Sequence, residues 1–328
     1  MADTFTPSDT SSPTTLAPSD GGTGTPRSRR ARPSWLGLVP FFGYVAVVFL
    51  VPVGFILFSA FRQTTQGASI RDPITQQFVH QDSTSFTGTN FAQSLQGVYR
   101  TSLITSMELS AVVAVIGAVF GMLLAYAVVT SGNRALRQIV TAAAAVTANF
   151  GGIPLAFLFI ATLDTNSGIV TRFLRDHFHL SLQDSLHLQL AQLSGLSVVY
   201  LYFLVPLMVL VMTPALEGLK PQWAEAAENL GANRWQYWRF VAGPVLLPNF
   251  LGSLLLLFCS SFSAYATAYA INSSFPLVTI RISSVLSGNV LSGQENLGAA
   301  LAVDMIIIVL PLTVLYQLLQ RRTARWLA

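Results

Sequence analysis

The chain of 328 residues is strongly apolar, with 52% hydrophobic residues, only 10% charged residues and a mean hydropathy of +0.57. Soluble domains carry about 25% charged residues, so this composition excludes an ordinary soluble enzyme and indicates a polytopic membrane protein. The single cysteine, Cys259, excludes an intrachain disulfide and a cysteine-based zinc site. The net charge of +4 is better explained by membrane topology than by nucleic-acid binding.

The N-terminal stretch 1–33 is rich in Ser, Thr, Pro and Gly. Such a stretch cannot bury enough surface to offset the entropy of ordering, so we predict a disordered cytoplasmic tail. The tail ends in four arginines that weakly match a twin-arginine signal, but the apolar run after them is too long for a signal peptide. That run predicts a first transmembrane helix over 34–62, and the polar segment 63–100 is expected outside the membrane.

Five further apolar stretches are each long enough to cross a bilayer. They indicate an all-α membrane protein with six transmembrane helices, in which a Gly-Gly-Ile-Pro run at 151–154 should bend the third helix because glycine and proline weaken helices. Residues 322–328 are expected to form a cytoplasmic C-terminus. The five predicted spans cover about 103–129, 139–163, 194–216, 244–271 and 297–319.

The distribution of positive charge predicts the orientation of these spans. Six spans place both termini on the same side of the membrane. That side carries twelve lysines and arginines, and the other side carries six. Because positive residues favour the cytoplasmic side, we predict that both termini and the segment 217–243 are cytoplasmic.

The segment 217–243 is polar and lies between two predicted spans. It contains a Glu-Ala-Ala-Glu run at 225–228 of good or tolerable helix formers, followed by Gly231, which is a typical helix stop. A second short helix is expected over 232–239, and the Gly-Pro pair at 243–244 should break it before the chain re-enters the bilayer. The pattern predicts a helix-turn-helix that lies along one membrane face.

This stretch resembles the EAA loop of type I ABC importer permeases, because the Glu-Ala-Ala run is followed by Gly231 and by a Leu-Pro pair at 247–248. In that family the loop is a cytoplasmic coupling helix that docks on an ATP-binding subunit, and the resemblance extends over a five-helix core at 101–321, preceded by one N-terminal helix. The alternative is an ordinary helix at the membrane interface. The coupling residues that the resemblance implies are Glu225, Ala226, Ala227, Glu228, Gly231 and Pro248.

The same resemblance implies an ATP-binding subunit, a second permease subunit and an extracytoplasmic solute-binding protein as partners, within a lipid membrane. A P-loop needs Gly-x-x-x-x-Gly-Lys-Ser/Thr, but Pro221 follows the only lysine, Lys220. We therefore expect a transport subunit and not an enzyme, without a cofactor of its own, whose partner binds ATP and Mg²⁺. The histidines fall in predicted external loops, and even His177-x-His179 is better explained as a surface loop than as a metal site.

Two acidic residues, Glu108 and Asp304, fall inside predicted spans. An unpaired charge there costs at least about 2.5–3.5 kcal/mol on insertion scales, so such groups usually face a cavity or a polar partner. They could line a translocation route that favours cations, or they could form hydrogen bonds between helices or contact a partner permease. Asn149, Gly152 and Pro154 are further candidates for the route, with helix packing as the alternative.

The substrate is less well indicated than the fold. The order and length of the segments are similar to those of polyamine and iron permeases, which implies a small charged solute such as a polyamine. Sugar permeases share this layout and remain the alternative. An ion-coupled carrier would be expected to show repeated halves, and an integral-membrane enzyme would need a clustered site at the membrane face. Neither feature is evident in the sequence.

Overall fold

The computed structural model of the chain describes residues 38–65, 69–71, 78–80, 83–165, 167–179, 189–287 and 295–327. The predicted tail at 1–33 lies outside the described residues. The chain divides at Leu50 into two units. In the first unit, helix α1 (Val39–Val45) leads into a π-helical turn, η2 (Ala46–Leu50). The uninterrupted helical run Val39–Ala60 is apolar and long enough to cross a membrane.

The second unit begins at Val51 and holds the other elements. It is a bundle of long helices with two small antiparallel ladders, in which β1 pairs with β4 (Arg62 opposite Phe86) and β2 with β3 (Ser69 opposite His80). The all-α expectation is confirmed, and the ladders fall within the segment predicted as external. Its elements are α2 (Val51–Ala60), β1 (Arg62–Thr65), β2 (Ser69–Arg71), β3 (Phe78–His80), β4 (Ser83–Phe86), α3 (Thr89–Ser94), α4 (Gly97–Thr130), α5 (Arg134–Asn149), α6 (Ile153–Leu163), α7 (Ile169–Phe178), α9 (Leu193–Glu217), α10 (Pro221–Asn229), α11 (Arg234–Tyr237), η3 (Trp238–Ala242), α12 (Gly243–Phe262), α13 (Ala266–Ile271), α14 (Val278–Leu286) and α15 (Glu295–Leu327).

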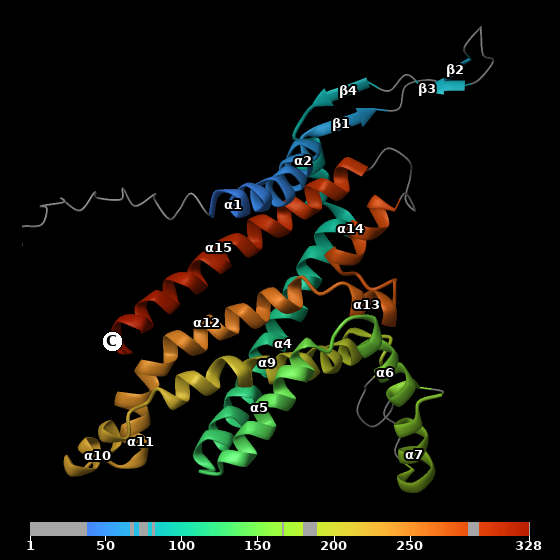
Figure 1. Ribbon diagram of the computed structural model, residues 1–328. Helices are drawn as coiled ribbons and strands as arrows, with labels where there is room; N and C mark the ends of the chain where they lie inside the picture. Colours follow the sequence, from blue (N-terminus) through green and yellow to red (C-terminus); the bar gives the residue numbers. More distant parts are fainter. Residues whose placement is uncertain are drawn as a thin grey trace, which may run out of the picture. The chain divides into compact units, whose positions relative to one another are not determined.

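Helices α4 and α9 form the centre of the bundle and run parallel to each other (Figure 1). A Cβ added at Gly117 would lie 3.2 Å from Leu204 Cβ, and one added at Gly121 would lie 2.4 Å from Met208 Cβ. The two glycines therefore let the helices approach closely, as small residues spaced four apart do in membrane bundles. Because matching positions advance together along both helices, the chain between α4 and α9 must return to the end at which α4 began.

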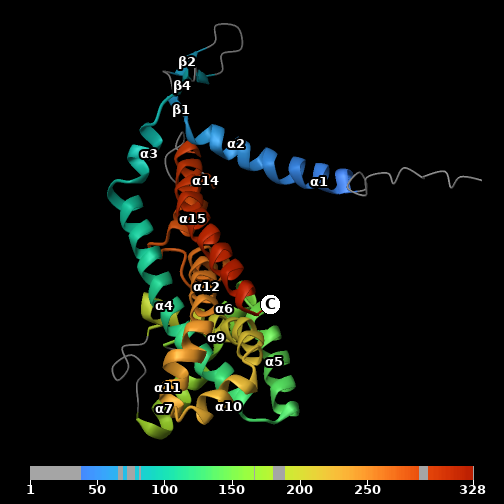
Figure 2. The same ribbon diagram turned by 90° about the vertical axis from the view of Figure 1, so that its left-hand side faces the viewer.

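The remaining long helices run against or along this pair. Tyr200 on α9 donates a hydrogen bond to the Ala264 carbonyl (3.2 Å), whereas Ser253 on α12 donates to Met212 Sδ on α9 (3.6 Å), so α9 and α12 are antiparallel. Figure 1 and Figure 2 show α12 beside α9, with α10 and α11 at one end of the bundle and α14 at the other. These are called the α10 end and the α14 end below.

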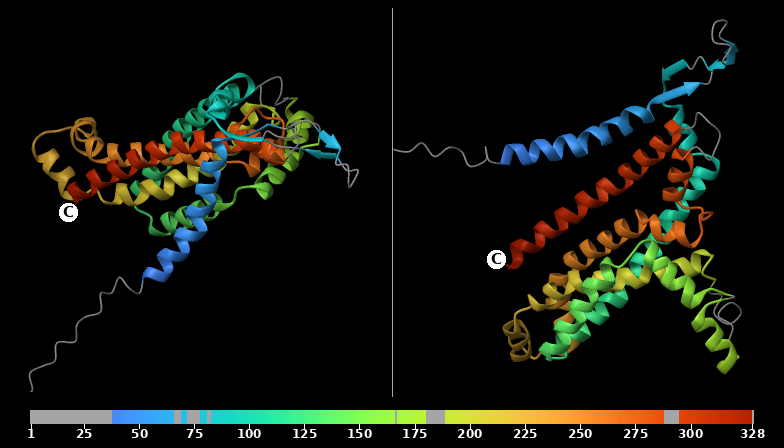
Figure 3. Two further views of the ribbon diagram at one scale, coloured as in Figure 1. Left: turned by 90° about the horizontal axis from the view of Figure 1, so that it is seen from above. Right: turned by 45° about the vertical axis from the view of Figure 1, so that its right-hand side comes forward.

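Helices α5 and α6 return the chain between the parallel pair, but not as one straight span. The chain bends by 101° between them. The right-hand view of Figure 3 shows this bend. With 16 residues at about 1.5 Å each, α5 alone is about 24 Å long, which is short of a hydrocarbon core of about 30 Å. The predicted bend is therefore present, and the described residues contain five candidate spans, or six if this bent pair is counted as one.

The span that follows α11 differs from the prediction. We predicted that the Gly-Pro pair at 243–244 breaks the helix, with the span covering 244–271, yet the helical candidate span runs without a break over Arg234–Phe262. Proline lacks an N–H and clashes in a regular helix, and the π-helical turn η3 just before the pair absorbs this irregularity. Proline is also tolerated at the first positions of α12.

Candidate functional site

Helix α10, which contains the Glu-Ala-Ala-Glu run, is a separate short helix between two long ones. It ends in a Schellman motif: the Ala232 N–H donates to the Ala227 carbonyl and the Gly231 N–H donates to the Glu228 carbonyl, both at 2.9 Å. Gly231 has a φ of +78°, and an added Cβ would have no heavy atom within 4 Å. The predicted helix stop is thus confirmed, and glycine is favoured there by its backbone conformation and not by crowding.

The chain restarts at Asn233 through a capping box. The Asn233 side chain accepts from the Gln236 N–H, and the Gln236 side chain accepts from the Asn233 N–H, both at 2.8 Å. This reciprocal pair fixes the direction of α11 relative to the turn at Gly231. The sequence prediction started the second helix at 232 and overlooked the cap, although Asn-x-x-Gln is a readable signal.

An apolar groove of about 690 Å³ lies between α10 and the helix that follows it. Ala227, Ala232 and Pro248 line it, and Ala227 is 8% exposed because the groove walls of the same chain cover it. Its rim presents large apolar side chains: Leu230 is 88% exposed and Phe240 is 69% exposed. Such exposure at the end of a membrane bundle is typical of an interaction surface.

The predicted coupling residues therefore occupy different positions around one surface. Glu225 and Glu228 are exposed and do not line the groove, Ala226 is exposed and also lines it, and Ala227 and Pro248 contribute to its walls. Among the described residues, neither Glu225 nor Glu228 takes part in an ion pair. Ala227 is buried, so its small size is explained within the chain, whereas Ala226 is exposed at the groove, where a partner can contact it.

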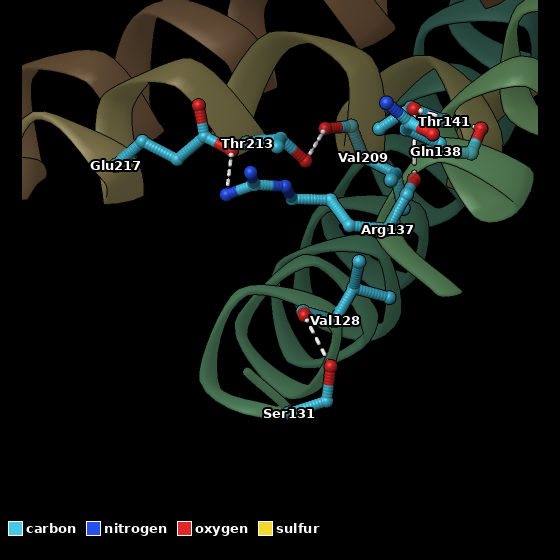
Figure 4. Close-up of polar contacts among 8 residues, drawn as sticks. All are labelled: Val128, Ser131, Arg137, Gln138, Thr141, Val209, Thr213 and Glu217. Carbon is cyan, nitrogen blue, oxygen red and sulfur yellow. Dashed lines mark hydrogen bonds and ion pairs between the residues drawn. The ribbon is translucent and has the colours of Figure 1, made fainter. Parts of the chain in front are cut away.

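An ion pair connects α5 to the end of α9, just before α10. Arg137 and Glu217 form an ion pair at 2.8 Å between the first turn of α5 and the last residue of α9, four residues before α10 begins (Figure 4). Both side chains are about two fifths exposed, so the pair contributes little to stability, about 0–1 kcal/mol. Its position matters more, because it connects the bent pair α5–α6 to the segment that leads into α10.

The two acids in the spans lie in unlike surroundings. Glu108 is exposed on α4, on a stripe that also exposes the apolar side chains of Ile104 and Val112. Asp304 on α15 is only 8% exposed and lies beside Ser94, and its Oδ2 has no hydrogen-bond partner in the part of the chain that the structure describes. The structure does not bring the two carboxylates together.

The other route candidates mark the break between α5 and α6. Asn149 ends α5, and its Nδ2 donates to the Ala145 carbonyl at 2.8 Å. Gly152 has φ +75° and ψ −149°, a region essentially restricted to glycine. Its N–H donates to Thr267 Oγ1 (2.9 Å), which donates to the Gly152 carbonyl (3.2 Å) and so joins the break to α13. Pro154 lies in the first turn of α6, where no helical hydrogen bond is lost.

Two structural features were missed by the sequence analysis, and only the first had a readable signal. Gly117 and Gly121 form a Gly-x-x-x-Gly pattern, which is a known signal for close helix packing. Arg281, which was counted only for topology, has a buried Nε without a hydrogen-bond partner among the described residues. Within the described ranges, no group of three or more potential metal-binding side chains occurs, and His177 stacks on Phe173.

Comparison with known proteins agrees with this architecture. The family described as "Binding-protein-dependent transport system inner membrane component" matches residues 117–327, which is well over half of the chain. The chain is 25% identical over 217 residues to the ferric transport system permease protein FbpB of Actinobacillus pleuropneumoniae, covering 65% of this chain and 30% of that protein. It is 37% identical over 71 residues to the sulfate transport system permease protein CysT of Escherichia coli, covering 22% and 26%. The chain thus spans about a third or less of the length of these relatives.

Among solved structures, a bacterial alginate ABC transporter in complex with an alginate pentasaccharide-bound periplasmic protein has a similar chain. The TM-score is 0.63 with 14% identity, over 88% of this chain and 94% of that chain, so this likeness shows the fold. The region of this chain that matches the family includes the groove, the α10 segment and all the long helices from the middle of α4 onward. The chain is therefore a multi-pass inner-membrane protein that belongs to the binding-protein-dependent transport system inner membrane components, the permease family of type I ABC importers.

Proposed function

We propose that this permease couples solute import to a separate ATPase through α10. The observation that carries the proposal is the position of α10: it is a short helix between α9 and α12, it exposes Glu225 and Glu228, and it borders an apolar groove. The exposed Ala226 at the groove lets a partner surface approach the helix closely, whereas a helix that only rested on lipid headgroups would tolerate bulk at this position.

The α10 end is proposed to face the cytoplasm. Arg134, Arg137, Lys220, Arg234 and Arg239 belong to elements at this end, and these positive charges favour the cytoplasmic side. Helix α15 runs antiparallel to α12, because Leu301 near its start packs in one cluster with Phe262 at the end of α12. The C-terminus would then be cytoplasmic as well, together with the N-terminal tail if six spans cross the membrane.

The proposed partners are an ATP-binding subunit, a second permease subunit and an extracytoplasmic solute-binding protein. The name of the family, and the periplasmic protein bound in the similar alginate transporter, support the last of these. ATP and Mg²⁺ would be bound by the ATPase, since the sequence has no P-loop pattern. Glu108 supports a second permease or a solute route, because a carboxylate on an apolar exposed face of a span needs a polar neighbour.

For the substrate we propose a small charged solute. The relatives are named for ferric iron and sulfate, both of which are small and charged, and neither is named for a polyamine. The proposal therefore rests on the class, with a polyamine as one solute to test beside iron, sulfate and a sugar. Measuring which solute stabilises the cognate binding protein would decide among these four.

The coupling proposal is tested with Ala226→Trp in the reconstituted complex of permeases, ATPase and binding protein. Because Ala226 is exposed where it lines the groove, the added ring should occupy the surface on which the partner docks without displacing buried residues of the chain. We expect normal assembly, but loss of ATPase stimulation by loaded binding protein and loss of uptake. Val47→Trp, at a position of the first helical run that is 64% exposed, adds similar bulk away from α10. Full stimulation and uptake in Ala226→Trp would overturn the proposal.

A further inference from the structure

A second cavity lies at the α14 end of the bundle, opposite the α10 end (Figure 1). It has a volume of about 580 Å³ and lies among α3, α14 and the first turns of α4 and α15. Its polar lining comes from Gln93, Gln96, Tyr99, Arg281 and Ser284. All the lining residues belong to the described part of the chain, and Arg281 is the only one among them with a formal charge.

The Arg281 guanidinium lacks compensation within the described ranges of the chain. Its Nε is buried and has no hydrogen-bond partner, and neither of the ion pairs found there includes it. The residue as a whole is only partly buried, but a buried donor atom that is left unpaired is costly, and in native proteins such atoms are nearly always satisfied by a partner, an ion or a ligand. The cavity beside it provides the space for such a group.

The backbone adds donors of the same kind. Gly97 and Val98 are the first residues of α4, and both line the cavity. The first N–H groups of a helix have no intrahelical acceptor, and the cap residue Gln96 makes no side-chain hydrogen bond to them. Their partial positive charge has the same sign as Arg281. Ser284 adds no donor, because its hydroxyl donates to the Arg281 carbonyl at 2.9 Å.

We propose that this cavity binds an oxyanion, with the Arg281 guanidinium as the principal donor and the first turn of α4 as the second. Planar guanidinium groups and helix N-termini both suit the oxygens of sulfate and phosphate. Two candidate membrane spans begin at Gly97 and Asn296, and residues near the start of both line the cavity. The oxyanion can therefore come from solution or from the phosphate of a lipid headgroup.

The test measures binding of radiolabelled sulfate and of inorganic phosphate to the delipidated full-length transporter complex, at matched ionic strength. Arg281→Gln removes the charge and should weaken binding about tenfold or more, since hydrogen bonds to charged groups contribute about 1.5–3 kcal/mol. Arg281→Lys keeps a point charge without the planar fork of the guanidinium, and its affinity should lie between those of the wild type and Arg281→Gln. Arg100→Gln is the matched control, because it removes an exposed charge from the first turn of α4 at a residue that does not line the cavity.

The same samples distinguish the two sources. Saturable binding of free sulfate or phosphate that is lost in Arg281→Gln and kept in Arg100→Gln supports a soluble oxyanion. If free anions do not bind, but phosphatidylglycerol co-purifies with the wild type and with Arg100→Gln and not with Arg281→Gln, the site holds a lipid headgroup. If the wild type binds neither, or if Arg281→Gln binds both as well as the wild type, the proposal is wrong. Melting temperatures without anion show that the variants are folded.

Discussion

The parallel pair α4–α9 and the bent pair α5–α6 differ in continuity and in how their helices are held. Both cross the bundle, but α4 and α9 are continuous and touch along a seam at Gly117 and Gly121, whereas α5 and α6 are interrupted at residues 150–152. The seam is apolar and closely packed, whereas the break has a polar attachment to α13 through the Thr267 hydroxyl, beside the packing of Leu155 on α6 against α9 and α13. A close-packed seam between two continuous helices resists displacement, whereas the non-helical residues at the break can change the angle between α5 and α6 without breaking the hydrogen bonds inside either helix. We therefore expect movement during transport at the break and not at the seam.

The largest expected effect comes from filling the seam with Gly121→Leu. A Cβ there would approach the Val205 carbonyl oxygen to 2.8 Å as well as Met208, so α4 and α9 would have to separate. Overpacking of this kind costs about 1–3 kcal/mol and sometimes more. Gly54→Leu is the control, since no atom lies within 4 Å of a Cβ at Gly54. Thermal unfolding of the purified subunit should show a large loss of stability for Gly121→Leu alone, and equal melting temperatures would contradict the seam.

A smaller effect is expected at the break, where two adjacent glycines form a matched pair. Gly152→Ala forces a Cβ into a conformation that is nearly restricted to glycine, at a cost of about 1–3 kcal/mol. Gly151→Ala meets no atom within 4 Å, and Gly151 is not among the residues with a positive φ. We expect slower uptake and a lower melting temperature for Gly152→Ala only. If both variants transport equally well, the unusual backbone at Gly152 has no functional importance.

The attachment of the break to α13 is tested by replacing Thr267. Thr267→Val keeps the shape but removes both hydrogen bonds to Gly152, each worth about 0.5–1.5 kcal/mol. Thr267→Ser keeps the hydroxyl and serves as the control. If the bonds fix the angle between α5 and α6, Thr267→Val should change the distance between spin labels on α5 and α6, as measured by pulsed electron resonance. An unchanged distance distribution would show that packing alone sets the angle.

The sequence allowed the spans and the α10 motif to be predicted because both depend on local composition. Apolar runs indicate spans wherever they occur, and Gly231 indicates a helix end through its own backbone freedom. The course through 243–244 could not be predicted in the same way, because a π-helical turn accommodates the proline and depends on how the neighbouring residues pack. Likewise, Asp304 and Glu108 look alike in the sequence, and only tertiary contacts make one buried beside Ser94 and leave the other exposed.

The smallest effect on stability, yet the sharpest test of the comparison, is expected at the Arg137–Glu217 pair, because it links the bent pair to the root of α10. Breaking this half-exposed pair with Arg137→Gln or Glu217→Gln should change the free energy of unfolding by no more than about 1 kcal/mol. If the pair carries motion between α10 and α5, each single variant should reduce uptake per ATP hydrolysed, and the double variant should be no worse than either one. Such non-additivity in a double-mutant cycle is the signature of two side chains that act through each other. Additive losses would mean that the two residues act separately. Unchanged uptake in all three variants would mean that the ion pair is only a structural contact and carries no motion.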